Sequence, residues 1–263
     1  MAPVIEVQNL SAGYNEDMVL KDISFSVKPL RITTIVGPSG CGKSTLFRCI
    51  VGLLPPKKGK VLIFGNDIYS MDEEKRLEVM QKVGFLFQGG ALLNSLTVLE
   101  NIALPLREHT KLSDSVIEEI VRLKLELVGL GDAWHLLPGE LSGGMRKRAA
   151  LARALALDPE VLLCDEPSAG LDPQTAAGLD TLLLELRDLL KMTIVVVTHE
   201  IPSIQKISDD VIMLGMGGTL VFSGTLQETR MAEKEEVAAF FGRMPTQASK
   251  GSLTAENFLL GAE

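Results

Sequence analysis

One nine-residue stretch constrains this chain more than any other, because it combines glycines, a lysine and hydroxyl side chains in a fixed spacing. The stretch reads Gly37, Pro38, Ser39, Gly40, Cys41, Gly42, Lys43, Ser44 and Thr45. A β-branched run at 32–36 precedes it and an amphipathic segment at 46–53 follows it, so we expect a strand, a glycine-rich turn and a helix. The glycines let successive backbone N–H groups turn inward and form a nest for phosphate oxygens at the positive end of that helix.

The G-x-x-x-x-G-K-S spacing assigns a role to each polar side chain of this loop. Lys43 is expected to reach the terminal phosphates as a point charge, and the Ser44 hydroxyl is a ligand for a magnesium ion that bridges them. Thr45 is expected to hydrogen-bond the adjacent phosphate. A glycine-rich turn without a ligand is the alternative, and the strand and helix on either side disfavour it. The stretch therefore predicts a site for a nucleoside triphosphate with Mg²⁺.

Composition narrows the class of protein. A chain of 263 residues is long enough for one large α/β domain with a lobe. No apolar run approaches the ~18 residues of a membrane helix, and the N-terminus lacks the features of a signal peptide, so we expect a soluble, intracellular protein. Cys41, Cys49 and Cys164 make no disulfide framework. The net charge of −8 argues against nucleic acid as a partner, but it leaves a membrane protein open.

The first third of the chain reads mainly as strands. Residues 4–7 and 19–27 alternate apolar and polar side chains, which predicts two antiparallel strands joined by a turn at 11–15. Tyr14 lies in that turn, where an aromatic side chain either closes the edge of the core or stacks on a base. A third strand is expected at 60–64.

A charged helix is predicted at 72–80, and a short apolar strand at 83–87 ends in Gln88. A glutamine at the end of a buried strand either ends the core with its hydrogen bonds made within the protein, or faces the ligand.

From residue 97 to about 157 the pattern becomes helical. Thr97, Ser113 and Ser142 stand where helices are expected to begin. We therefore predict a helical lobe, about 89–157, inserted into the α/β domain. The basic cluster in its last helix is expected to be a solvated face: Arg146, Lys147 and Arg148.

Two carboxylates follow the continuous apolar run at 161–164, which is typical of a central parallel strand. Asp165 and Glu166 are therefore expected in the ligand crevice at the carboxyl end of the sheet. Asp165 would bind magnesium directly or through water, and Glu166 would polarise the attacking water. His199 ends the strand predicted at 193–198 beside the same crevice, which favours a functional role over a structural one.

The rest of the chain adds a helix at 173–190, a hairpin at 211–222 and helices that start near 225 and 233. In the tail, Phe258-Leu259-Leu260 either docks on a second subunit or accessory protein, or belongs to a disordered end.

Taken in order, these motifs resemble the nucleotide-binding subunits of ABC transporters over residues 4 to about 230. The resemblance is carried by Gly37 to Thr45, Gln88, Leu141-Ser142-Gly143-Gly144-Met145, Leu162 to Pro167, Ser168-Ala169-Gly170-Leu171-Asp172 and His199. It implies an α/β P-loop NTPase core with a mixed, largely parallel sheet, an N-terminal antiparallel β subdomain and the inserted helical lobe. The implied nucleotide-binding domain spans 1–231, and 232–263 form a C-terminal helix and tail.

The resemblance also implies residue roles for ATP and Mg²⁺. Tyr14 stacks on adenine, Gln88 contacts magnesium and water while sensing the partner, and Asp172 links two sites. Lys43, Glu166 and His199 form the catalytic set, with Glu166 as general base and His199 on the γ-phosphate. The metal ligands are Ser44, Gln88 and Asp165.

In the family, the start of the helix at Ser142, Gly143 and Gly144 meets the γ-phosphate bound by the opposite subunit. One phosphate loop and one such helix, on separate lobes, favour a homodimer.

Met145 replaces the glutamine that is usual in the family. With the segments 87–92, 101–110 and 145–154, it resembles the branch that powers Mce/Mla-type phospholipid transport in bacterial envelopes. That branch implies a membrane permease, Mce-type and accessory subunits, and a peripheral position on the cytoplasmic face of the inner membrane.

Two alternative functions are weighed against transport. A soluble ABC ATPase of iron–sulfur cluster assembly or DNA repair keeps the same fold, but the chain has neither the long coiled-coil insertion nor the zinc-type cysteine pairs of the repair type. A nucleotide-bound scaffold without turnover is disfavoured because Glu166 and His199 are both present.

Overall fold

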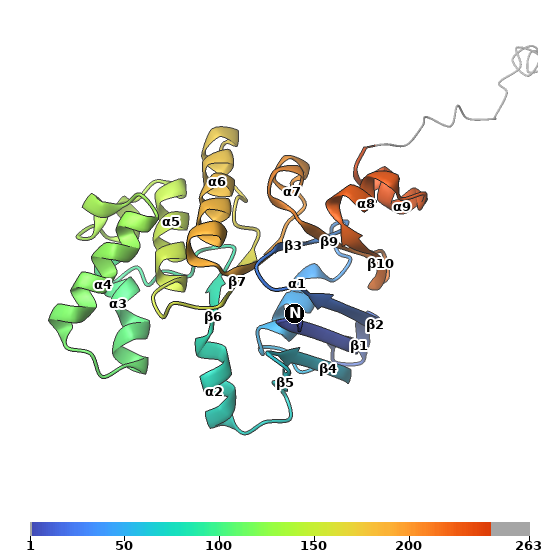
Figure 1. Cartoon of the computed structure of the whole chain (residues 1–263), viewed down its shortest axis with the longest axis horizontal. Helices are drawn as coiled ribbons and strands as arrows, with labels where there is room; N and C mark the ends of the chain where they lie inside the picture. Colours follow the sequence, from blue (N-terminus) through green and yellow to red (C-terminus); the bar gives the residue numbers. More distant parts are fainter. Residues whose placement is uncertain (1, 243–263) are drawn as a thin grey trace, which may run out of the picture.

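Two sheets and the helix packed between them organise the chain (Figure 1). The computed structural model describes residues 2–242. Within them the larger sheet has six strands in the order β10-β9-β3-β8-β7-β6, and all but β10 run parallel. These strands are β3 (Ile32–Val36), β6 (Val83–Leu86), β7 (Val161–Asp165), β8 (Thr193–Val197), β9 (Asp210–Gly215) and β10 (Thr219–Thr225). Because β3, β8 and β7 are neighbours, the segments that follow them meet at one edge.

The smaller sheet is antiparallel, in the order β2-β1-β4-β5. Its strands are β1 (Ile5–Tyr14), β2 (Asp17–Val27), β4 (Lys58–Ile63) and β5 (Asn66–Asp67). Helix α1 (Lys43–Ile50) lies between the two sheets, where Leu46, Phe47 and Ile50 share one core with apolar residues of both. Helix α1 therefore links the phosphate loop to the largest buried surface of this half of the molecule.

The predicted antiparallel pair at the N-terminus is confirmed, but the predicted turn at 11–15 is wrong. Strand β1 continues to Tyr14, and the chain reverses at Asn15 and Glu16. Register shifts between Val7 and Leu10, and again after Leu10, interrupt the pairing of β1 with β2. Such bulges break the alternation of buried and exposed residues from which the strand end was predicted.

Helices form a lobe at one end of the larger sheet (Figure 1). After α2 (Glu73–Gln81) and β6, the lobe contains α3 (Val98–His109), α4 (Asp114–Leu127) and α5 (Gly143–Ala154), and α6 (Pro173–Leu190) packs between it and the sheet. Thr97 caps α3 in a reciprocal bond with Glu100, as an N-terminal threonine followed by glutamate predicts. Ser113 precedes α4 without a side-chain cap and instead contacts Ser115.

The last described helices cover the β9–β10 end of the sheet. They are α7 (Ile201–Ile207), α8 (Leu226–Met231) and α9 (Glu235–Phe240). Val237 and Phe241 share a core cluster with Met213 of β9 and Val36, the last residue before the phosphate loop. The hypothesis for Phe258-Leu259-Leu260 lies outside the described residues.

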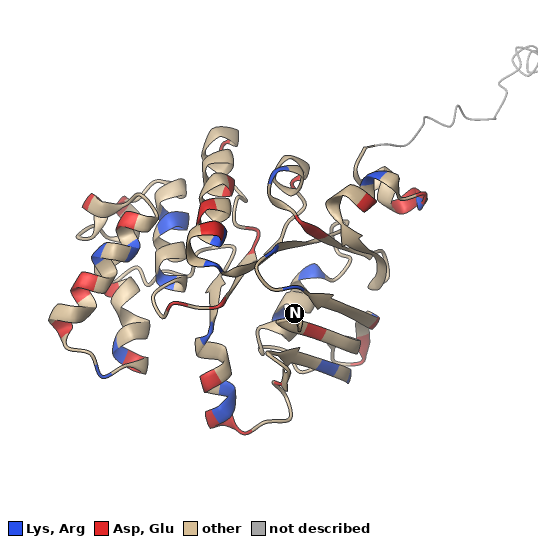
Figure 2. Ribbon diagram, in the orientation of Figure 1, with Lys and Arg blue, Asp and Glu red and all other residues tan. Residues whose placement is uncertain are grey.

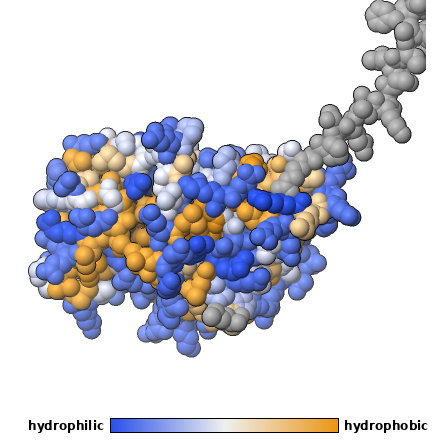
Figure 3. Space-filling view, turned by 45° about the horizontal axis from the view of Figure 1, so that its top comes forward, coloured by the Kyte–Doolittle hydropathy of each residue, from blue (hydrophilic) through white to orange (hydrophobic). Residues whose placement is uncertain are grey.

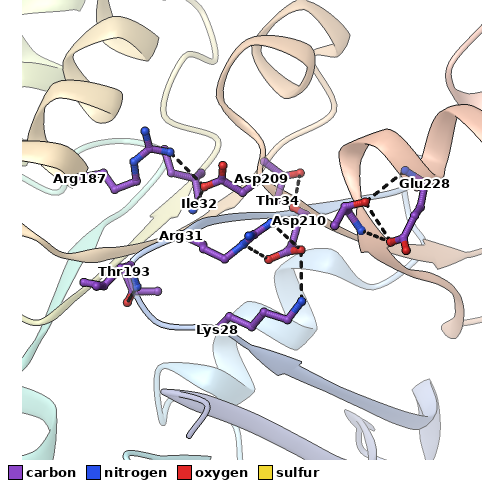
Figure 4. A network of polar contacts seen from close by, with 11 residues as sticks. Lys28, Arg31, Ile32, Thr34, Arg187, Thr193, Asp209, Asp210 and Glu228 are labelled. Atoms are coloured by element: carbon purple, nitrogen blue, oxygen red, sulfur yellow. Dashed lines mark hydrogen bonds and ion pairs between the residues drawn. The ribbon is translucent and has the colours of Figure 1, made fainter. Parts of the chain in front are cut away.

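Ion pairs fix the start of β3, the strand that leads to the phosphate loop (Figure 4). Arg31 donates two hydrogen bonds to Asp210, at 2.6 and 3.1 Å, and Lys28 lies 3.7 Å from the same carboxylate. Asp209 accepts from the Ile32 amide at 2.8 Å and from Arg187 at 3.0 Å. Strand β3 is therefore tied to β9 and to α6 at its base.

Acidic and basic residues are interspersed along the surface helices, for example on α2 and α4 (Figure 2). On the face shown in Figure 3, apolar residues gather over the helical lobe and the middle of the molecule. Within residues 2–242, none of the helices combines the length and the apolar character needed to span a membrane.

Candidate functional site

The phosphate loop is folded around the amine of Lys43. The Nζ atom donates to the carbonyl oxygens of Gly37 at 2.8 Å and Pro38 at 3.0 Å, and the side chain is buried. Gly42 caps α1 with φ 105°, in the left-handed region. Gly37 has φ 149°, and a Cβ there would lie 2.4 Å from the carbonyl oxygen of Leu214. The loop therefore needs glycine at both positions, as its sequence predicts.

The remaining loop residues divide into exposed and buried groups. Ser39, Gly40 and Ser44 are exposed, whereas Cys41 and Thr45 are buried. Burial raises the pKa of the Cys41 thiol, which keeps it neutral. The Ser44 hydroxyl is therefore available to a ligand in solution, while Thr45 packs inward.

The two carboxylates lie at the carboxyl end of β7, next to β8. The Oε1 atom of Glu166 lies 2.8 Å from Nδ1 of His199, and the Glu166 amide donates to Val197 at 2.8 Å. The Oε2 atom of Glu166 is buried and finds no hydrogen-bond partner within residues 2–242. Burial, followed by the charge of Glu166, raises the pKa of Asp165. One carboxylate oxygen is thus fixed by the histidine, and the other is buried without a hydrogen-bond partner among the described residues.

Helix α5 holds the loop that contains Gln88 and the backbone of Glu166. Lys147 Nζ donates to the Gln88 carbonyl and, at 3.2 Å, to the Glu166 carbonyl. Arg153 donates to the carbonyls of Gly90 and Ala91 at 2.8 and 2.7 Å. The Gln88 residue itself is exposed.

The predicted solvated face of α5 is therefore wrong for Lys147, which is buried. Arg148 is half-buried and donates to the Val128 carbonyl, so Arg146 alone of the three is exposed. Burial lowers the pKa of Lys147, although the neighbouring carboxylates oppose that shift. Sequence reasoning missed this residue. Its spacing of three and four residues from the buried Ala150 and Leu151 was the available signal.

Tyr14 ends β1 and is 41% exposed, so its side chain is accessible to a ligand. Arg48 of α1 donates to its hydroxyl at 2.6 Å, and the guanidinium carbon lies 6.0 Å from the ring centroid. Arg48 thus fixes the orientation of the tyrosine, a contact that the sequence did not indicate.

Ser142 is the N-cap of α5, and its Oγ accepts from the Met145 amide at 3.2 Å. Ser142 and Gly143 are exposed, so α5 begins at the surface, with the Met145 amide capped by Ser142. A Cβ on Gly144 would lie 2.5 Å from the Thr175 side chain, and Thr175 is bound by Asp172, the N-cap of α6. The start of α5 is thereby packed against the loop that contains Asp172.

The structure brings one subset of the predicted residues together and leaves another apart. The phosphate loop, Asp165, Glu166 and His199 follow the adjacent strands β3, β7 and β8. Ser142 to Gly144 belong to the helical lobe instead. Within residues 2–242, no group of three His, Cys, Asp or Glu side chains is arranged to hold a metal ion by itself.

A phosphate loop at the start of a helix, with carboxylates at the end of a neighbouring parallel strand, defines a P-loop nucleoside triphosphatase. A model of the ABC transporter family matches residues 20–169. The chain belongs to this family, whose members bind ATP, and the predicted fold class is confirmed.

Curated relatives agree with the family. The chain is 42% identical to a probable ribonucleotide transport ATP-binding protein, mkl, of Mycobacterium leprae over 81% of its own length and 62% of that protein. It is 39% identical to the intermembrane phospholipid transport system ATP-binding protein MlaF of Haemophilus influenzae, over 90% of this chain and 89% of that one.

Solved structures agree as well. The cbiO1 protein from Clostridium perfringens, part of the ABC transporter complex cbiONQ, matches with a TM-score of 0.80 and 29% identity, over 93% of this chain and 97% of that one. The dimeric structure of a bacterial ABC transporter cassette matches with a TM-score of 0.77 and 32% identity, over 84% of this chain and 98% of that one.

Proposed function

We propose that two copies of this chain bind and hydrolyse ATP at their interface and thereby drive a membrane permease that moves phospholipid across the bacterial envelope. The observation that carries the ATPase is the contact between Glu166 and His199 beside the phosphate loop. The name of the Haemophilus influenzae relative, which matches nearly the whole chain, supports phospholipid as the cargo.

The residues of the site divide the work of phosphoryl transfer to water. Lys43 and the loop amides bind the phosphates, and Tyr14, oriented by Arg48, stacks on the adenine. Glu166 accepts the proton of the attacking water, and its Oε1 atom is held by His199. His199 contacts the γ-phosphate and holds the carboxylate in place.

The residues present also fit a magnesium ion. Ser44 is exposed at the start of α1, and Asp165 ends the neighbouring strand β7, where burial and the charge of Glu166 raise its pKa. Ser44, Asp165 and Gln88 would supply oxygen ligands, which Mg²⁺ prefers. Bound there, the ion would neutralise charge on the phosphates.

The second half of each ATP site comes from the partner subunit. Ser142, Gly143 and Gly144 present the amide end of α5 to solvent, on a lobe separate from the phosphate loop. A helix N-terminus binds anions, so this turn of one chain meets the γ-phosphate held by the other. The dimeric assembly of the similar cassette supports this arrangement.

The permease docks in a groove between the helical lobe and the sheet. The groove has a volume of about 460 Å³ and an apolar lining that includes Leu77, Phe85, Phe87, Leu104 and Pro105. It lies beside the segment that follows β6, so an inserted permease segment is placed next to Gln88 and its nucleotide contact.

Transport in proteoliposomes tests the proposal. The chain is co-reconstituted with the membrane permease that co-purifies with it, and ATP-dependent movement of a fluorescent phospholipid is measured against a Glu166→Gln control. Lipid movement with the wild type, but not with the Glu166→Gln variant, supports the proposal. The name of the Mycobacterium leprae relative favours ribonucleotide as a second candidate cargo. ATP-dependent uptake of a labelled ribonucleotide, without lipid movement, would show that the cargo is ribonucleotide and not phospholipid.

A further inference from the structure

Glu166 adopts a backbone conformation that its side chain disfavours. Its φ is 46°, in the left-handed region, although it is not a glycine. Such a conformation persists only where the surroundings hold it. Three hydrogen bonds to its backbone do so: the amide donates to Val197 at 2.8 Å, and the carbonyl accepts from the Ala169 amide and from Lys147, each at 3.2 Å. One of these three hydrogen bonds therefore comes from a side chain of α5.

The same amine also holds the Gln88 carbonyl, so a single side chain joins two segments that follow different strands. A buried lysine costs free energy unless its donors are used, and Lys147 uses them on backbone carbonyls rather than on a carboxylate. An apolar residue would fill this volume at lower cost. The two carbonyls that Lys147 joins therefore account for the presence of a lysine at this buried position.

We propose that Lys147 is a positioning residue that keeps Gln88 and Glu166 at fixed positions relative to α5. The inference rests on the proposed ATPase function. Lys147 lies about one turn after Ser142, so the helix end that meets the partner's nucleotide is linked directly to the residues that serve the chain's own nucleotide. Movement of α5 on dimer closure is then transmitted to Gln88 and Glu166.

The test compares Lys147→Met with Lys147→Arg, which keeps the charge and the donors. Lys124→Met is the matched control, because Lys124 is also buried in the helical lobe but pairs with Asp158 at 2.5 Å. Each variant of the full chain is measured for thermal unfolding, ATP affinity, kcat and local hydrogen exchange. If Lys147→Met shows no cooperative unfolding, Lys147→Gln, which is too short to join both carbonyls, replaces it.

For Lys147→Met we expect kcat to fall about 10- to 100-fold, because small displacements of catalytic groups have effects of that size. We expect ATP affinity to stay within about threefold, since the phosphate loop is unchanged. Amide exchange should accelerate at 88–91 and 166–169. Lys147→Arg should recover most of kcat and of the protection, and Lys124→Met should leave both unchanged.

The proposal is overturned if exchange in those two segments is unchanged in Lys147→Met, or if Lys124→Met lowers kcat equally. The exchange measurement needs no turnover. A wild-type chain that does not hydrolyse ATP therefore contradicts the proposed function, while exchange still decides the role of Lys147.

Discussion

Glu166 and His199 come from neighbouring strands and contact each other through Oε1 and Nδ1 at 2.8 Å. The contact follows from the register of β7 and β8, in which Asp165 pairs with Val197. It leaves the second oxygen of Glu166 buried and, within residues 2–242, unpartnered. The carboxylate is thus oriented before any ligand binds, which is the arrangement that a general base requires.

Replacing Glu166 by glutamine should keep ATP binding and remove most turnover. General-base help contributes about 10²–10⁴-fold, so kcat should fall by that factor. A nucleotide-bound closed dimer should accumulate, which size-exclusion chromatography with ATP detects. The matched variant Lys43→Ala should impair the step before hydrolysis, because it weakens the binding of ATP. Near-normal hydrolysis by Glu166→Gln would remove Glu166 from its assigned role.

Asp165→Asn should stabilise the nucleotide-free chain at neutral pH and abolish Mg²⁺-dependent hydrolysis. Burial and Glu166 raise the pKa of Asp165 in the folded state. A raised carboxyl pKa contributes stability at low pH, and this contribution is lost as pH rises through the folded pKa. The gain in melting temperature should therefore shrink on acidification. A variant that melts below the wild type at neutral pH would contradict this reasoning.

Permease binding should be lost when a charge enters the proposed groove. Leu77 lines the groove and is 48% exposed, so Leu77→Asp should release the permease without unfolding the chain. Leu104, which also lines the groove and is half-buried, is the second target, whereas Leu92 lies outside the lining and packs against the lobe core, so Leu92→Asp would destabilise the fold.

The control for the groove is Leu189→Asp at the end of α6, where the leucine is 66% exposed. Co-purification from detergent is the measurement. The groove assignment fails if Leu77→Asp and Leu104→Asp retain the permease as well as Leu189→Asp does.

The ion pairs at the base of β3 should matter for stability. Asp210 is buried and takes both Arg31 bonds, so Asp210→Ala should cost about 2 kcal/mol, the size expected for hydrogen bonds to a charged group. Asp188→Ala, which removes an exposed partner of Arg187, should have almost no effect. Denaturant unfolding compares the two. Equal losses would show that the Arg31 pair does not hold β3.

Much of the fold is predictable from the sequence because its strands are short, apolar and bounded by turn residues. The long helix predicted at 173–190 matches α6 at both ends, since Asp172 and Pro173 define its start. Strand β1 was predicted less well, because bulges are decided by pairing with β2 rather than by local pattern.

In the candidate site, too, local motifs are predictable from the sequence and contacts between distant segments are not. The phosphate loop and the carboxylates are visible as local motifs, but Lys147 is not, because its partners are backbone carbonyls 59 and 19 residues away in the chain. The Arg48 contact with Tyr14 is likewise created by the fold.

The central claim is that each ATP site is built from two chains, and a mixed dimer tests it most directly. Lys43→Ala chains and Ser142→Arg chains, both in a Glu166→Gln background, are given different affinity tags and purified in tandem. If Lys43 of one subunit and Ser142 of the other serve the same nucleotide, both lesions fall in one site and the other site is intact. Arginine is chosen because its bulk blocks the amide end of α5.

Bound nucleotide per dimer is then counted after gel filtration. The account predicts one tightly held ATP in the mixed dimer and none in either parent dimer. A mixed dimer that holds no nucleotide would contradict the account, because each site would then be built within one chain.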